Sequence, residues 1–498
     1  MGNHHSGGKP SSQGPKRIST SSDKDILIRV IPDHNNPHLA IPEHHHKPGK
    51  IETLRYVFAH VVQGNFQFYE AEDWSADMRL AQQMGIDAFA INIGRDLTNE
   101  KQLPLIYEIA EMSSFHVFLS FDMVYYGHSG SSEDIIRLIE QFAPRKAQFI
   151  YQGKPLVSTF SGEVPGNLLD NIPDYNSAWN CLKEKLNFPV GSILAALNSL
   201  NNIYFLPCWT GIDPKAVPSV DGMLSWDAWC PVLSSQDCRY KDNLAVVGKQ
   251  YAAPLSAMFY KHLSDCKYGN YLYPADSWFV VEKFLDLLSL KPDFIEILSW
   301  NDYGESHYLR DPRPSANLPV EGISSEKYVK DMPHEPLLDL ISYFNESAEV
   351  VRLTSSDGTS QDPVHLSKGA EMFSKAYVWY RPHPKDAVSK SDSLPIPGGA
   401  SATEDKMYIA ILVSSTTNLQ LIKIESGDKS YYIEVEEYGT CEAKDVILLI
   451  SIPFQVGDNQ NLKLYNQDQS LLGGLGGHPI TSEPEVYNFN YWSGFIEF

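Results

Sequence analysis

Two carboxylates lie close together in one short polar stretch, Asn301-Asp-Tyr-Gly-Glu305, directly after an apolar run at residues 294–300. Paired acids are suited to cleaving a glycosidic bond, because a protonated carboxyl can donate to the leaving oxygen while an ionised one attacks carbon or activates water. A separation of three residues in a loop does not fix the distance between the carboxyl groups, so retention and inversion are both allowed. Aromatic side chains frame the pair: Trp300, Tyr303 and Tyr308.

Acids and tryptophans recur at the ends of other apolar runs in the chain. A single acid there usually caps a helix or bonds a loop. A repeated combination favours a sugar-binding cleft, in which flat rings stack on sugars and carboxylates bind hydroxyl groups. The residues concerned are Asp96, Asp122, Glu163, Trp209, Asp213, Trp226, Asp227, Trp229 and Trp300.

Strand-like runs alternate with helical periodicity between residues 51 and 350, and the pattern predicts a (β/α)8 TIM barrel. In such a barrel, catalytic groups lie at the C-terminal ends of the strands. An open doubly wound sheet is the alternative, and the lack of a glycine-rich phosphate loop after an early strand disfavours it. The expected strands are residues 56–62, 88–93, 117–123, 155–161, 203–209, 222–226, 255–260 and 294–300.

The rest of the chain differs in composition from the expected barrel. Residues 1–50 are polar and rich in Pro and His, which predicts a disordered tail. Residues 351–406 are expected to be a linker with long loops and the first strand of a second domain. Residues 407–498 alternate with period two and predict a C-terminal all-β sandwich, within which the glycine-rich segment 471–477 is expected to be a flexible loop.

The net charge of −22, from 40 basic and 62 acidic residues, argues against nucleic acid and anionic membranes as partners. No apolar run approaches the roughly 18 residues of a membrane span. The first 24 residues contain no apolar segment of the kind found in a secretory leader. We therefore expect a cytoplasmic, monomeric protein.

Two rival functions remain at this point. A metal-dependent barrel hydrolase could use His60, Asp302 and His307 as ligands, but no second cluster completes such a site. We therefore expect neither a metal nor a cofactor. A non-catalytic sugar-binding protein would keep the tryptophans but would not need both Asp302 and Glu305.

Six stretches together carry a family resemblance: Phe58-Ala-His60 with Gly64-Asn65, Asp73-Trp74, Gly85-Ile-Asp-Ala-Phe-Ala-Ile-Asn-Ile-Gly94, Ser120-Phe-Asp-Met123, Trp300-Asn-Asp-Tyr-Gly-Glu-Ser306 and Trp379-Tyr-Arg-Pro-His-Pro384. With these motifs the chain resembles glycoside hydrolase family 71, the fungal endo-α-1,3-glucanases also called mutanases. The resemblance runs from about residue 51 to the C-terminus, and the motif that contains Asp302 and Glu305 is its longest and most specific part.

The resemblance implies endo-hydrolysis of α-1,3-glucan with inversion by a catalytic pair, with Glu305 as general acid and Asp302 as general base. A glycosidase of another linkage specificity is the alternative activity. Because family members are commonly secreted and this chain shows no leader, we expect it to reach a cell or ascus wall from inside, for example in spore release. The expected substrate-binding residues are His60, Asp96, Asp122, Trp209, Asp227, Trp229, Trp300 and Tyr303.

Overall fold

The computed structural model describes residues 27–32, 55–188, 202–230, 235–265, 269–274, 278–320, 323–347, 374–414, 417–435 and 446–498. Most of the expected tail at 1–50, and the expected linker up to residue 373, lie outside these described residues.

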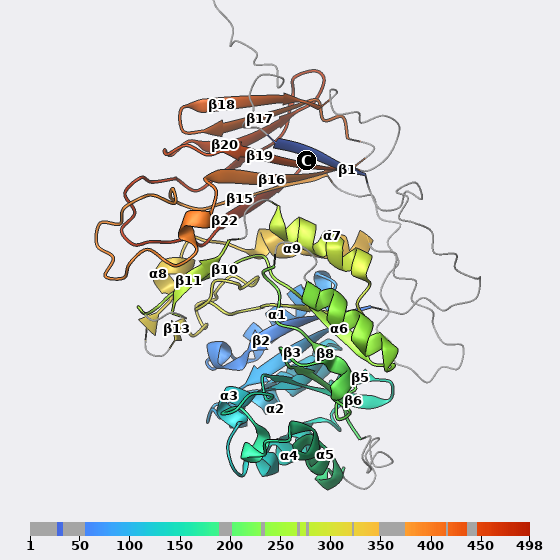
Figure 1. Ribbon diagram of the computed structural model, residues 1–498. Coiled ribbons are helices and arrows are strands. Elements are labelled where there is room, and N and C mark those ends of the chain that lie inside the picture. The colour runs from blue at the N-terminus through green and yellow to red at the C-terminus, as the bar shows by residue number, and fades with distance from the viewer. Residues whose placement is uncertain are drawn as a thin grey trace, which may run out of the picture.

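Eight parallel strands close into a barrel, as the sequence predicts (Figure 1). Ring closure is complete because the first barrel strand, β2, pairs with both β3 and β12, and β4 pairs with β6. A short strand, β5 (Ile150–Tyr151), forms a hairpin with β6 at the rim. Around the ring the strands are β2 (Tyr56–Val62), β3 (Ala88–Ile93), β4 (His116–Asp122), β6 (Lys154–Phe160), β7 (Tyr204–Cys208), β8 (Gly222–Leu224), β9 (Gln250–Leu255) and β12 (Phe294–Ile297).

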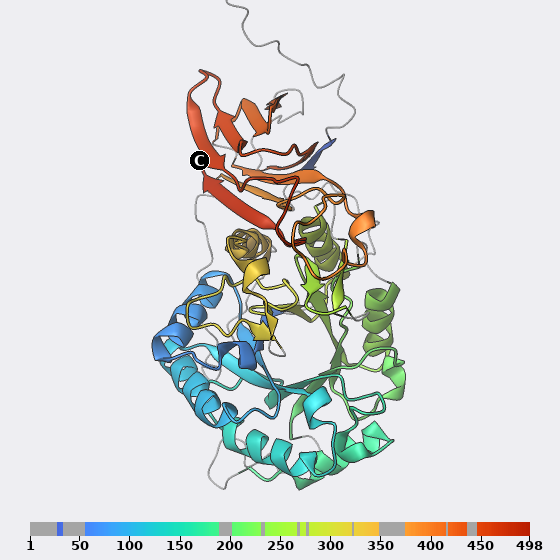
Figure 2. The same cartoon turned by 90° about the vertical axis from the view of Figure 1, so that its left-hand side faces the viewer.

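Helices surround the ring of strands, as Figure 2 shows. Between β7 and β8 the described chain forms only a 3-10 turn, Pro214–Ala216, in place of a helix. Within the described part of the chain, no helix combines the length and apolarity required to cross a bilayer. The helices are α1 (Ala71–Gln83), α2 (Asn99–Ser113), α3 (Met123–Tyr126), α4 (Ser131–Phe142), α5 (Tyr175–Lys185), α6 (Ser235–Val246), α7 (Phe279–Leu290), α8 (Glu326–Val329) and α9 (Glu335–Ser347).

The seventh barrel strand differs from the prediction. The sequence favours 255–260, whereas the strand is β9, residues 250–255, whose middle is Ala252-Ala-Pro254. Small residues and proline have low strand propensity, so the pattern hides this strand. Proline is tolerated because β8 pairs with β9 only as far as Leu224 and Ala252, and Pro254 lies beyond that ladder. Residues Phe259–His262 instead form β10, in a hairpin with β11 (Asn270–Tyr273).

The C-terminal part of the chain forms two antiparallel sheets that enclose an apolar core (Figure 1). The five-stranded sheet has the order β1-β19-β16-β15-β22, with β1 (Leu27–Pro32), β19 (Val446–Pro453), β16 (Lys406–Val413), β15 (Lys375–Tyr380) and β22 (Trp492–Glu497). The four-stranded sheet has the order β18-β17-β20-β21, with β18 (Lys429–Glu434), β17 (Leu421–Ser426), β20 (Gln460–Tyr465) and β21 (Leu471–Gly476). Two further short strands, β13 (Pro319–Val320) and β14 (Ile323–Ser324), pair with each other.

Two segments of this sandwich were expected to be irregular. Within the predicted tail, β1 pairs with β19 along six residues, so the tail contributes a strand to the C-terminal sheet. The glycine-rich segment 471–477 contains β21, which pairs with β20. A Cβ atom on Gly473 would lie 3.1 Å from Ile496 Cδ1. Glycine therefore lets β21 approach β22 closely, and the segment is a strand rather than a flexible loop.

The five-stranded sheet also packs against the barrel, on the side of α7 and α9 (Figure 2). Trp278, just before α7, donates its indole N–H to the Ile450 carbonyl at 3.1 Å. Tyr377 on β15 bonds Asp339 on α9, as does Lys375. The apolar cluster around the barrel therefore extends onto the outer face of the five-stranded sheet, and the interior of the sandwich is a separate apolar core.

Candidate active site

The loop after β12 carries Asp302 and Glu305, and the first barrel strand holds it in place. The side chain of Asn301 accepts from Val62 N–H at 2.8 Å and donates to Val62 C=O at 2.9 Å. This amide continues the pairing of β12 with β2 beyond the end of the strand. The backbone N–H of Trp300 donates to His60 C=O at 2.8 Å. The first residues of the loop are therefore held beside β2.

Buried side chains fix the same loop from below. Trp300 donates to Asp77 of α1 at 3.0 Å, and Arg310 pairs with the other oxygen of Asp77 at 2.8 Å. The Tyr303 ring packs 5.2 Å from Tyr308, centroid to centroid. Because Asp77 is fully buried, its charge needs these partners.

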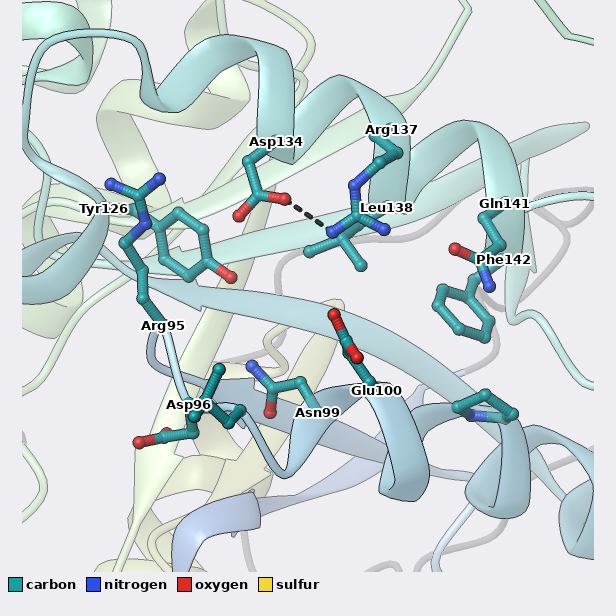
Figure 3. Close-up of a pocket in the computed structure, with 12 residues that line it drawn as sticks. Arg95, Asp96, Asn99, Glu100, Tyr126, Asp134, Arg137, Leu138, Gln141 and Phe142 are labelled. Carbon is teal, nitrogen blue, oxygen red and sulfur yellow. Dashed lines mark hydrogen bonds and ion pairs between the residues drawn. The ribbon is translucent and has the colours of Figure 1, made fainter.

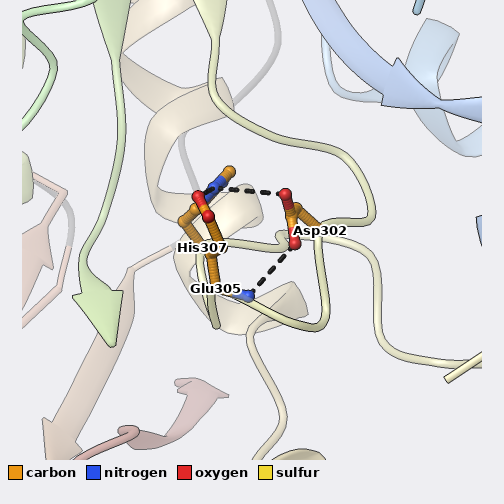
Figure 4. A group of neighbouring side chains, drawn as sticks. All are labelled: Asp302, Glu305 and His307. Carbon is orange, nitrogen blue, oxygen red and sulfur yellow. Dashed lines mark hydrogen bonds and ion pairs between the residues drawn. The ribbon is translucent and has the colours of Figure 1, made fainter. Parts of the chain in front are cut away.

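The carboxyl groups of Asp302 and Glu305 meet at one imidazole, His307 (Figure 4). His307 Nε2 lies 3.2 Å from Glu305 Oε2 and 3.6 Å from Asp302 Oδ2. One oxygen of each carboxyl and one His307 nitrogen all lie within 4.8 Å of one another. The backbone N–H of Glu305 donates to Asp302 Oδ1 at 3.1 Å. Both acids keep about a quarter of their side chains exposed, at 23% and 28%, so substrate can reach them.

A lysine from a different element completes the cluster. Lys261 on β10 donates to Glu305 Oε1 at 2.9 Å. The backbone of the same strand also contacts this residue, since Tyr260 N–H donates to Glu305 C=O at 3.0 Å. Sequence reasoning missed Lys261, because it is 44 residues away from Glu305 and belongs to no acidic or aromatic motif.

The surroundings shift the pKa values of Asp302 and Glu305 in opposite directions. Burial raises the pKa of Asp302, the negative charge of Glu305 adds to the effect, and His307 only partly opposes it. Burial also acts to raise the pKa of Glu305, but hydrogen bonds and positive charge from His307 and Lys261 outweigh it and lower that pKa. For His307, the two carboxylates raise the pKa against the effect of burial. Glu305 is therefore the more readily ionised acid, and Asp302 keeps its proton to higher pH than Glu305 does.

The opposite pKa shifts of Asp302 and Glu305 favour the reverse of the roles that the resemblance implies. A general acid must carry a proton before the reaction, and a general base must be ionised. Where two neighbouring carboxyl groups have pKa values shifted in opposite directions, the group with the raised pKa is suited to be the acid and the group with the lowered pKa the base. Asp302 is suited to donate the proton and Glu305 to accept one.

Asp96, Asp122 and His60 lie at the neighbouring ends of β3, β4 and β2. Asp122 caps α3 by accepting from Val124 N–H at 2.9 Å. Burial raises the pKa of Asp122 to about 6, and the charge of the exposed Asp96 contributes in the same direction. His60 is only 5% exposed and bonds the buried Glu296 at 2.8 Å, so it lines the barrel interior.

Three aromatic residues expected to bind substrate are buried instead. Trp209, Trp300 and Tyr303 are at most 1% exposed. Trp209 donates to Ser161 C=O at 3.1 Å and, like the other two, packs within the core. A ring without an exposed face cannot stack on a sugar, so these three residues anchor the loops around the site.

Trp229 is partly exposed and lies beside the cluster of Asp302, Glu305 and His307. Its ring lies 5.3 Å from His307 and stacks with Tyr273 of β11 at 5.5 Å and an interplanar angle of 13°. A bond from its indole N–H to Met258 C=O at 2.9 Å fixes the ring. Asp227, two residues earlier, is partly exposed. Tyr273 was not predicted, and it extends the aromatic surface with 42% of its area exposed.

A separate cavity of about 340 Å³ lies between α2 and α4 (Figure 3). Asp96 is one of its lining residues, which links it to the rim at β3. Its wall carries both signs of charge, including the Asp134–Arg137 ion pair at 2.6 Å. Neither Asp302 nor Glu305 lines this cavity, so it is distinct from the cluster that these two acids form with His307.

The cluster of Asp302, Glu305 and His307 also has the spacing of a cation site. The Lys261 ammonium already lies on Glu305, however, and supplies a balancing positive charge from the chain itself.

Comparisons with known proteins identify relatives of this chain. The family model described as glycosyl hydrolase family 71 matches residues 53–497. The chain is 30% identical over 456 residues to the glucan endo-1,3-alpha-glucosidase of Schizosaccharomyces pombe, covering 89% of this chain and 95% of that protein. It is 31% identical over 451 residues to a mutanase of Penicillium rubens, covering 88% of each. A second S. pombe protein, named ascus wall endo-1,3-alpha-glucanase, is 26% identical over 376 residues, covering 73% of this chain and 80% of that protein.

Proposed function

The chain belongs to glycosyl hydrolase family 71, and from this premise we propose that it hydrolyses α-1,3-glucosidic bonds within glucan chains. Its relatives are named for this activity. The observation that carries the proposal is the pair of accessible carboxyl groups at the end of the eighth barrel strand, with pKa values shifted in opposite directions.

In the proposed mechanism Asp302 is the general acid and Glu305 the general base. Protonated Asp302 donates to the glycosidic oxygen as the bond to carbon breaks. Ionised Glu305 takes a proton from the water that attacks the same carbon. Lys261 and His307 keep Glu305 ionised until that step, and the proton gained by Glu305 returns to Asp302 through solvent before the next cycle.

We propose inversion at the anomeric carbon, as the resemblance implies, on the condition that the two carboxyl groups move apart when substrate binds. Inverting enzymes hold their carboxyl groups about 6.5–9.5 Å apart to admit water, whereas oxygens of Asp302 and Glu305 lie within 4.8 Å of each other. Lys261 and His307 hold Glu305, so Asp302 is the group that must turn towards the sugar when substrate binds.

Purified protein incubated with insoluble α-1,3-glucan tests the activity. We expect new reducing ends from the parent and a loss of at least about 10²-fold in Asp302→Asn and in Glu305→Gln. Full activity in both variants would reject the site. Cleavage of β-1,3-glucan but not α-1,3-glucan would reject the substrate, and binding without new reducing ends would indicate a non-catalytic glucan-binding protein.

NMR of the first products separates the two stereochemical outcomes. Initial β-anomers from an α-linked polymer would support inversion and the proposed turn of Asp302. Initial α-anomers would show retention, in which the pair acts at its short spacing with one carboxylate as nucleophile.

We further propose that the enzyme acts on a cell or ascus wall from the cytoplasmic side, as in spore release. The name of the ascus wall relative supports this biological role. Fluorescent tagging of the full chain tests the location: signal inside the cell until lysis is expected, and signal outside intact vegetative cells would overturn it.

A further inference from the structure

The β10–β11 hairpin extends from the barrel between β9 and α7 and holds Glu305 from one face. Side chains alternate along a strand, so Lys261 points to Glu305 while its neighbour His262 points to the opposite face. The side chain of His262 is fully buried. The position of the ammonium on Glu305 thus depends on what holds the buried face of the hairpin.

That face is held by the C-terminal part of the chain. His262 Nε2 lies 2.9 Å from Oδ2 of Asp392, in the loop between β15 and β16. Asp392 also accepts from Leu394 N–H at 3.0 Å and Tyr487 N–H at 2.8 Å. Its side chain is 1% exposed. One carboxylate therefore joins its own loop, the segment before β22 and the hairpin.

Backbone bonds align the same loop along the second strand of the hairpin. Leu272 N–H donates to Gly398 C=O at 2.8 Å, and Gly398 N–H donates to Asn270 C=O at 3.1 Å. Asn270 Nδ2 donates to Pro395 C=O at 2.8 Å, which turns its side-chain oxygen towards His262 Nδ1. Residues 392–398 thus act as a clamp on the hairpin, and Asp392 is the only charged group of the clamp that contacts His262 among the described residues.

We propose that Asp392 is a positioning residue of the active site, which acts through His262 to keep Lys261 on Glu305. The proposal rests on the proposed role of Glu305 as general base, and it makes the C-terminal region a working part of the catalytic centre. A merely structural clamp would affect stability and leave the proton chemistry at Glu305 unchanged.

The pH profile distinguishes these two roles. The charged and titratable groups that face Glu305 are Lys261 from β10 and Asp302 and His307 from its own loop. When Lys261 moves away, Glu305 loses a positive neighbour and its pKa rises. The acid limb of kcat/KM then moves to higher pH, because a larger fraction of Glu305 is protonated and cannot act as base.

The experiment compares full-length Asp392→Asn with the parent, using a soluble α-1,3-gluco-oligosaccharide across the acid pH range. Asparagine keeps the shape of the side chain but removes its charge. We expect the acid limb to move up by roughly half a pH unit, on the order of a threefold loss of kcat/KM on that side. Lys261→Met should move the limb in the same direction, and the double variant should move it no further than Lys261→Met alone.

Asp405→Asn is the matched control, because Asp405 lies in the same region and pairs with buried Arg381 at 2.9 Å rather than with a residue of the hairpin. Its acid limb should coincide with that of the parent. His262→Gln tests the link from the hairpin side if Asp392→Asn does not fold.

Three results would overturn the proposal. The first is an unshifted acid limb in folded Asp392→Asn or His262→Gln, and the second is an equal shift in Asp405→Asn. The third is a shift in the double variant that adds to that of Lys261→Met. A loss of all activity in Asp302→Asn with no shift in Asp392→Asn would reject this inference and leave the proposed function intact.

Discussion

Asp302 and Glu305 belong to one loop, yet their surroundings differ enough to separate their roles. Glu305 contacts both Lys261 and His307, whereas Asp302 lies 3.6 Å from His307 and the Lys261 charge lowers its pKa only as a smaller effect. Coulombic interactions of this range shift a carboxyl pKa by about 1–3 units. The proposed division between acid and base therefore follows from where the positive charges lie, and each charge can be tested by substitution.

Replacing Lys261 with Met removes one of these charges and should raise the pKa of Glu305 by on the order of one unit. Because the base must be ionised, kcat/KM should fall first on the acid side of the optimum and recover as the pH rises. Lys261→Arg keeps the charge and should keep the acid limb close to that of the parent. A loss of equal size at every pH would contradict this role of Lys261.

His307 offers a test of the alkaline limb. Asp302 must be protonated to act as acid, so activity should be lost as the pH rises through its raised pKa. His307 lowers the pKa of Asp302, so His307→Gln should move the alkaline limb to higher pH while reducing kcat. Disappearance of the limb would mean instead that His307 itself titrates there. Rate profiles at saturating substrate decide between these outcomes.

At this scale the sequence predicts the acids but not their partners. Asp302 and Glu305 share one motif and can be recognised together, whereas Lys261 reaches Glu305 only through tertiary structure. Trp300 and Tyr303 stand next to the acids in sequence, which suggested sugar stacking. In the fold both rings are buried: Trp300 donates to Asp77 of α1 at 3.0 Å, and Tyr303 packs against Tyr308.

Among the elements, the barrel strands were largely predictable and the rim hairpin was not. Buried parallel strands are continuous apolar runs, and seven of the eight expected strands overlap those in the structure. The seventh was displaced because Ala252-Ala-Pro254 carries no strand signal. As a result, residues that form β10 of the hairpin were assigned to the barrel, and Tyr273 on β11 received no role.

Tyr273 should provide a stacking surface for glucan. Its ring stacks with Trp229 at 5.5 Å, and the Trp229 ring lies 5.3 Å from His307. An aromatic contact of this kind is worth about 0.5–1.5 kcal/mol, so Tyr273→Ala should raise KM for oligosaccharides roughly 2- to 12-fold with kcat little changed.

Tyr273→Phe keeps the ring and should retain the KM of the parent. Tyr432→Ala is a matched control that should also leave KM unchanged, because Tyr432 lies on β18 in the four-stranded sheet of the sandwich. If Tyr273→Phe were as impaired as Tyr273→Ala, the hydroxyl rather than the ring would carry the effect.

For the whole molecule, barrel and sandwich are joined by polar contacts as well as by apolar packing of the five-stranded sheet against the barrel. Asn488 donates to Tyr328 C=O at 3.1 Å, and Tyr260 OH bonds the Tyr487 carbonyl. The period-two pattern predicted the sandwich. It could not predict this joint, nor the addition of β1 to the sheet, because contacts between distant segments leave no local periodicity.

His383 should make this joint sensitive to acid. Its Nδ1–H bonds Pro384 C=O at 2.8 Å, and its Nε2 accepts from Asn488 N–H at 2.9 Å, so the neutral ring uses both nitrogens. Burial, with the charge of Arg381 adding to it, lowers the pKa of His383 from 6.5 to about 4. Stability from this group is therefore complete above pH 6.5 and is lost as the pH falls towards 4, by roughly 3 kcal/mol in total.

His383→Gln should remove most of that dependence, since the amide oxygen can accept from Asn488 N–H and the amide nitrogen can donate to Pro384 C=O. Urea unfolding at pH 7 and at pH 4.5 measures the difference for the parent and the variant. The exposed His128 provides the control: His128→Gln should lose as much stability on acidification as the parent. An equal loss in His383→Gln would assign the acid sensitivity elsewhere, with His334, whose pKa burial also lowers to about 4, as the next group to replace.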